Sequence, residues 1–80
     1  MRLSQLPKGK RGIVTECLLT GDMRRRLQDI GLIEGTIVQC VGISPLKDPA
    51  AYLIRGAVIA LRCEDAKKIV IEIETGETGW

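Results

Sequence analysis

The sequence contains no histidine and no phenylalanine, and its only aromatic residues are Tyr52 and Trp80. Without histidine the chain cannot form a Ser-His-Asp or Cys-His nucleophile, a histidine-based metal site, or the usual general base near neutral pH. Two aromatic rings are too few for the stacking platform on which single-strand nucleic-acid binders hold bases. These absences disfavour an enzyme and a nucleic-acid-binding domain.

Long hydrophobic runs are also absent: none approaches the roughly 18 residues that a transmembrane helix needs. The opening residues 1–4 do not resemble a signal peptide, and neither end carries a lipid-anchor motif. We therefore expect a cytoplasmic protein. With 80 residues, of which 45% are hydrophobic and 28% charged, we expect one small domain over residues 1–80, with residues 74–80 as a loose tail.

Three cysteines, Cys17, Cys40 and Cys63, occur without a CxxC pair. Their odd number disfavours a disulfide framework, and a structural zinc site usually takes four ligands from closely spaced pairs. We interpret them as small hydrophobic residues in or near the core and predict no resident cofactor. Weak binding of Fe²⁺ or Zn²⁺ by a thiol and carboxylates stays open, with Asp48, Glu64 and Cys63 as candidate ligands.

Charge is distributed unevenly along the chain. Residues 1–26 contain seven lysines and arginines against two acidic residues, whereas residues 64–80 contain two against five. The overall charge of +2 is too small to indicate a polyanionic partner. The gradient fits either a protein oriented toward an acidic partner surface or an ordinary solvated surface, and both interpretations stay open.

Five strands are predicted from runs rich in β-branched residues, at 12–18, 36–41, 52–55, 58–62 and 69–74. Gly35 is expected at a positive φ, Gly56-Ala57 in a hairpin, and residues 64–67 in one helical turn. This pattern predicts a mainly β protein that forms a small barrel. The side chains expected inside it are Val14, Leu27, Ile30, Val38, Cys40, Leu53, Ile59, Leu61, Ile69 and Ile71.

One short helix is predicted after the first strand. Met23, Leu27 and Ile30 recur at i, i+4 and i+7, which places them on one face of a helix. Gly31 is expected to end this helix as its C′ residue, with Leu32 folding back on Leu27 in a Schellman motif.

The segment from Ser44 to Pro49 is predicted to be an ordered loop, because Pro45 and Pro49 fix φ and push their preceding residues toward extended geometry. Leu46 between them is a candidate apolar anchor that loses little entropy on docking. Asp48 is either a turn former that bonds its own backbone or a carboxylate that binds a metal or a basic partner.

The order of several short motifs resembles the ferrous iron transport protein A (FeoA) family over about residues 8–73. The chain departs from that pattern at Glu34, where the family tends to have proline, and at Ser44 and Lys47. The motifs that carry the resemblance are Arg26-Leu27, Ile30-Gly31-Leu32, Gly35, Val38, Pro45, Asp48-Pro49, Arg55-Gly56, Leu61-Arg62, Ala66 and Ile69.

The resemblance implies an SH3-like barrel, related to the C-terminal domain of iron regulators of the diphtheria toxin repressor type. It further implies a small non-catalytic accessory protein of bacterial ferrous iron uptake, which docks on the cytoplasmic GTPase part of the permease, ferrous iron transport protein B. The residues expected to bind this partner are Arg24, Arg25, Pro45, Leu46, Lys47 and Asp48.

Three further readings stay open beside this one. The chain is alternatively a sensor domain for a divalent transition metal or, less in keeping with its few aromatic residues, a nucleic-acid-binding barrel. A weak homodimer is also compatible with the sequence.

Overall fold

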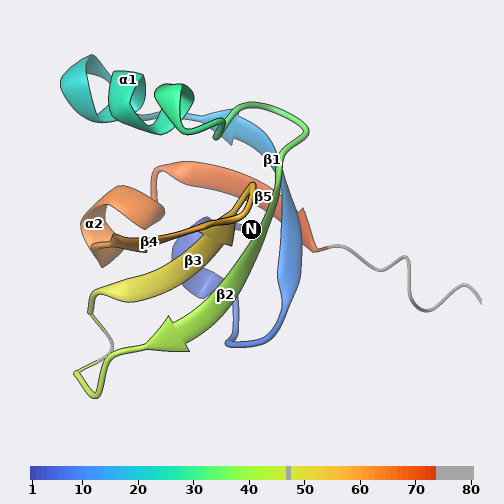
Figure 1. The fold of residues 1–80 in the computed structure, drawn as a ribbon, viewed down its shortest axis with the longest axis vertical. Coiled ribbons are helices and arrows are strands. Elements are labelled where there is room, and N and C mark those ends of the chain that lie inside the picture. The colour runs from blue at the N-terminus through green and yellow to red at the C-terminus, as the bar shows by residue number, and fades with distance from the viewer. Residues whose placement is uncertain (47, 74–80) are drawn as a thin grey trace, which may run out of the picture.

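The computed structural model describes residues 1–46 and 48–73 (Figure 1). It confirms the mainly β architecture with one short helix after the first strand, and the predicted element boundaries lie within about two residues of the observed ones. In chain order the elements are the 3₁₀ helix η1 (Leu3–Gln5), β1 (Arg11–Cys17), α1 (Gly21–Asp29), β2 (Ile37–Ile43), β3 (Ala50–Ile54), β4 (Ala57–Leu61), α2 (Cys63–Ala66) and β5 (Ile69–Ile73). The predicted tail at residues 74–80 lies outside the described residues, as does Lys47.

All five strands form one antiparallel sheet in the order β4-β3-β2-β1-β5. The register shifts between Val14 and Glu16 and again between Cys40 and Gly42. Such irregularities bend a strand and increase its twist, which allows a small sheet to curl round its own core. The curled sheet in Figure 1 therefore has β4 and β5 as its two edges, and α2 connects them.

The N-terminal segment covers one of these edges. The N–H of Ile71 donates to the carbonyl of Met1 at 2.7 Å, and Arg2 forms an isolated bridge with Val70. Leu3 and Leu6 are buried in the core. Sequence analysis assigned no element here, although the spacing of the two leucines by three residues fits the single helical turn that η1 forms.

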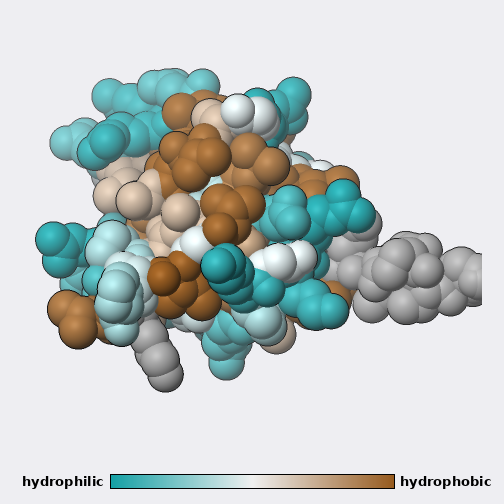
Figure 2. Space-filling view, turned by 60° about the horizontal axis from the view of Figure 1, so that its bottom comes forward, coloured by the Kyte–Doolittle hydropathy of each residue, from teal (hydrophilic) through white to brown (hydrophobic). Residues whose placement is uncertain are grey.

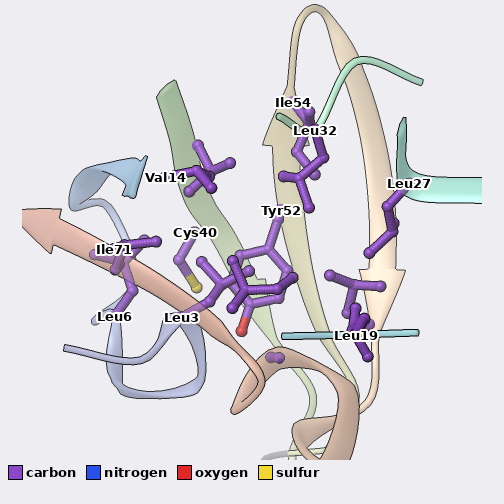
Figure 3. Close-up of a cluster of buried hydrophobic side chains, with 14 residues drawn as sticks. Leu3, Leu6, Val14, Leu19, Leu27, Leu32, Cys40, Tyr52, Ile54 and Ile71 are labelled. Carbon is purple, nitrogen blue, oxygen red and sulfur yellow. The ribbon is translucent and has the colours of Figure 1, made fainter. Parts of the chain in front are cut away.

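The core contains most of the side chains expected there (Figure 3). The prediction was wrong at Ile30, which is 37% exposed at the end of α1, and at Leu53 and Ile59, which are only partly buried. On β3 the inward positions belong to Tyr52 and Ile54, so the alternation of a strand turns Leu53 to the outer face. The expected core residues that are buried are Val14, Leu27, Val38, Cys40, Leu61, Ile69 and Ile71.

The end of α1 has the predicted Schellman geometry. The N–H of Leu32 donates to the carbonyl of Leu27 at 2.8 Å, and the N–H of Gly31 donates to that of Gln28 at 3.0 Å. Gly31 has a φ of +98° and Gly35, as predicted, a positive φ of +89°. A Cβ atom on Gly31 would overlap Cδ of Arg55, whose side chain lies across the glycine. The β3–β4 turn thus closes directly over the end of the helix.

Replacing Gly31 with alanine should lower the free energy of unfolding by about 1–2 kcal/mol, because an L side chain is strained at this φ and must displace Arg55. Chemical denaturation measures the loss. Gly42→Ala is the matched control: its backbone has no positive φ, its nearest new neighbour is Cβ of Ala51 at 3.8 Å, and we expect a change within about 0.5 kcal/mol. Equal losses in the two variants would contradict this account of the helix end.

Candidate functional site

The loop from Ser44 to Pro49 is held by its own hydrogen bonds. The N–H of Ser44 donates to the carbonyl of Pro49 at 3.2 Å, and the N–H of Asp48 donates to Oγ of Ser44 at 3.0 Å. Leu46 projects from the loop with 87% of its surface exposed, more than any other large hydrophobic side chain that the structure describes. The loop therefore presents an apolar side chain on a closed, internally bonded turn.

The loop is also tied to α2. Oδ1 of Asp48 accepts a hydrogen bond of 2.9 Å from the backbone N–H of Cys63, the first residue of that helix. The first N–H groups of a helix lack partners within the helix, and a carboxylate also interacts favourably with the helix dipole. Asp48 thus bonds a backbone fifteen residues away rather than only its own turn, and it fixes the loop against the far end of β4.

Two of the candidate metal ligands, Asp48 and Cys63, are brought together by this hydrogen bond. The thiol of Cys63 is exposed, and Glu64 follows in the first turn of α2. Within residues 1–46 and 48–73, however, no group of three or more histidine, cysteine, aspartate or glutamate side chains is placed to hold a metal ion. A metal ion bound by Asp48 and Cys63 would therefore need further ligands from other groups, such as water or a partner.

A hollow of about 300 Å³ lies beside the loop. The N-terminal residues 4–7 form one wall, and the other walls come from the sheet and the start of α2, including Ile43, Tyr52 and Cys63. Figure 2, in which the lower side of Figure 1 is turned forward, shows hydrophobic side chains grouped on this face between hydrophilic ones. Sequence analysis missed this hollow because it assigned no structure to the N-terminal residues.

Tyr52 is the group of this region whose pKa departs clearly from its ordinary value. Its ring lies within the core cluster in Figure 3, and the residue is 2% exposed. Burial raises the pKa of Tyr52 to about 12, and the negative charges of Cys40, Cys63 and Asp48 at high pH add to the effect. The folded state therefore holds the phenol proton more tightly than the unfolded state, whose tyrosine has the ordinary pKa of 10.0.

This difference predicts an alkaline loss of stability. The stabilisation is complete below pH 10 and disappears as the pH rises toward about 12, a change of about 2–3 kcal/mol. Unfolding free energies measured across this range should fall further for the natural chain than for Tyr52→Phe, which has no phenol to ionise. Tyr52 is the only tyrosine, so phenolate absorbance reports it alone. An absorbance midpoint near 10 in the folded protein would contradict the raised pKa of Tyr52.

Arg24 and Arg25, the two arginines expected to bind the partner, lie on a different part of the molecule from the loop. Arg24 lines a second hollow with Glu16 and Gln28, and this hollow shares no residue with the one beside the loop. Arg25 is exposed on the same helix. Figure 1 shows α1 at the top and the loop after β2 at the bottom. The residues expected to bind one partner thus form two separate surfaces.

Comparison with known proteins decides the family. The model of the FeoA domain matches residues 1–73. The chain belongs to the FeoA family. A relative from Porphyromonas gingivalis, named as a fusion of Fe²⁺ transport protein A and the Fe²⁺ transporter FeoB, is 36% identical over 73 residues. That match covers 91% of this chain and 9% of the fusion protein, so the chain corresponds to a small part of that relative.

Solved FeoA structures have the same fold. The solution structure of FeoA from Chlorobium tepidum is 33% identical, with a TM-score of 0.87 over 100% of this chain and 80% of that one. The zinc complex of FeoA from Stenotrophomonas maltophilia, described as a prokaryotic SH3 domain protein, is 30% identical, with a TM-score of 0.76 over 90% and 89%. The predicted SH3-like fold of this FeoA chain is thereby confirmed.

The same fold occurs in a more distant solved structure. IdeR from T. acidophilum matches 92% of this chain with 34% of its own length, at a TM-score of 0.80 and 20% identity. This likeness confirms the expected relation in fold. Among the described helices of this FeoA chain, none is long and apolar enough to cross a membrane.

Proposed function

We propose that this FeoA chain is a non-catalytic cytoplasmic accessory protein of ferrous iron uptake that binds the GTPase part of the ferrous iron permease, FeoB. The observation that carries the proposal is the Porphyromonas gingivalis relative, whose name joins transport protein A and FeoB in a single polypeptide. Two domains in one chain remain at high mutual concentration, so even weak contacts between them are populated. A separate FeoA must supply the same association through its own surface.

The loop from Ser44 to Pro49 supports this role. An interface gains most from an apolar side chain that enters a pocket of the partner, and Leu46 is exposed for such a contact. Asp48 donates a hydrogen bond to Ser44 and accepts one from Cys63, and these bonds hold the loop before docking, so little backbone entropy is lost on binding. Lys47 and the arginines of α1 would supply charge and orientation rather than most of the affinity.

Docking of this kind lets a small barrel influence a larger partner without chemistry of its own. A protein that binds one conformation of the GTPase better than another shifts the equilibrium toward that conformation by its difference in affinity. The nucleotide-dependent change then takes place in the permease. This chain contributes only a surface that binds one conformation of the GTPase more tightly than the other.

The zinc complex of the Stenotrophomonas maltophilia FeoA favours a second candidate, a divalent-metal sensor. On this chain the starting point for such a site is the pair formed by Asp48 and Cys63. Docking is the stronger proposal, because the described residues offer no third ligand of the histidine, cysteine or carboxylate type at this pair.

Leu46→Ala should weaken binding to the purified GTPase domain of the permease by about tenfold, since most of a buried leucine side chain would be removed from the interface. Calorimetric titration measures the affinity, and thermal unfolding should be unchanged because Leu46 is exposed. The control is Ile73→Ala, which shortens an apolar side chain that is 37% exposed on β5 and should leave the affinity unchanged. No binding by the natural chain would overturn the proposed function, and equal affinity of Leu46→Ala would remove the loop from it.

A further inference from the structure

The outer edge of β4 has backbone groups available for pairing. Ile54 and Ala57 are partners across the two-residue turn at Arg55 and Gly56, where both φ values are positive. In such a hairpin the closing pair is hydrogen-bonded and the bonded pairs then alternate, so Val58 and Ala60 direct their N–H and C=O groups away from β3. In the described part of the chain, no backbone hydrogen bond outside the sheet involves either residue.

This edge also lacks the features that usually protect one. The five residues of β4 include no charged residue, no proline and no glycine, and Val58 is 64% exposed. Natural proteins usually cover such edges or mark them with charge, because an open edge pairs with other chains. The opposite edge follows that rule, since Met1 and Arg2 lie along β5. One edge of the small sheet, β5, is therefore covered, and the other edge, β4, is open.

A groove runs between this edge and α1, which lies above β4 in Figure 1. It has a volume of about 340 Å³. Its apolar lining comes from Met23, Leu27 and Ile30 on the helix and from Ile59 and Leu61 on the strand. A strand added to β4 would place every second side chain toward this groove and the remaining ones toward solvent. The groove thus requires apolar side chains at alternate positions of its occupant.

The charges around the groove favour one kind of apolar peptide segment over another. Arg26 and Arg62 line it from the helix and from the end of β4, against a single acid, Asp65. A segment with acidic residues between its apolar ones would meet this potential favourably, and a basic segment would be repelled.

We propose that β4 binds, by strand addition, an extended partner segment in which apolar residues alternate with acidic ones. Main-chain hydrogen bonds to Val58 and Ala60 supply affinity, and the groove and its arginines supply specificity. The site is continuous with the loop, because Cys63, two residues beyond Leu61, is the residue bonded to Asp48. That the segment belongs to the permease rests on the function proposed above.

The test uses the full chain and a short synthetic peptide in which valine alternates with glutamate. Amide shifts on titration should be largest at Val58 and Ala60. Ala60→Pro, which removes one outward N–H without touching the β3–β4 ladder, should weaken binding about tenfold, whereas Ala60→Ser should bind normally. If the proline variant fails to fold, a peptide N-methylated at alternate residues should show the same loss. Equal binding by Ala60→Pro, or by the N-methylated peptide, would overturn the proposal.

Charge and occupant are tested separately. Arg26→Glu and a valine–lysine peptide should each weaken binding, and exchange of both together should restore it in part. Concentration-dependent self-association of the chain that Ala60→Pro abolishes would show that a second copy fills the edge, and would overturn the proposed occupant. If the permease GTPase domain binds Ala60→Pro and the natural chain equally, the assignment of the segment to the permease is wrong while the proposed function stands. If the peptide binds but the permease GTPase domain does not, strand addition at β4 stands and the proposed function is wrong.

Discussion

A five-stranded sheet of this size has two edges. Whether each edge is covered or left open determines which parts of the molecule are structural and which are available to a partner. The bulges in β1 and β2 curl the sheet around its core, but β4 and β5 are joined by α2 rather than by a ladder. Unpaired strand edges attract other chains, so each edge needs cover or a partner. Met1 and Arg2 cover β5, which makes the N-terminal residues part of the barrel and one wall of the hollow beside Tyr52.

The other edge and the loop after β2 form the side of the molecule that is open for recognition. The hydrogen bond from Cys63 to Asp48 connects them, because it joins the start of α2 to the loop that carries Leu46. In energetic terms an exposed leucine and an open strand edge each contribute little while the chain is alone, and both become favourable only when a partner removes them from water. Rigid presentation by the barrel is what converts these two features into a specific surface.

The sequence was sufficient for the fold because its signals are local. β-branched runs, Gly31 and Gly35 each fix a short stretch of backbone, and their order carried the resemblance to FeoA. It failed where burial depends on distant residues. Leu53 was placed inside although Tyr52 and Ile54 occupy that side, and Leu3 and Leu6 were overlooked because contacts with the distant β5 and α2 bury them. The hydrogen bond between Cys63 and Asp48 joins residues fifteen positions apart, and no short sequence motif indicates it.

Part of the candidate site could be predicted from the sequence and part could not. Pro45 and Pro49 indicated an ordered loop, and the exposure of Leu46 agrees with its proposed role as an anchor. Arg24 and Arg25 were grouped with that loop on charge alone, whereas the structure separates them. The groove beside β4 had no counterpart in sequence reasoning, because it arises from the relative placement of α1 and the end of the sheet.

The loop and the outer edge of β4 are expected to form one recognition surface, and amide chemical shift mapping of the natural chain with the purified GTPase domain of the permease tests this most directly. The perturbed amides should cluster at Leu46, Asp48 and the outer residues of β4, and those of Glu72 and the covered edge of β5 should not move. Perturbation centred on β1 and β5 would contradict the account, because the partner would then bind the side that the N-terminal segment already covers.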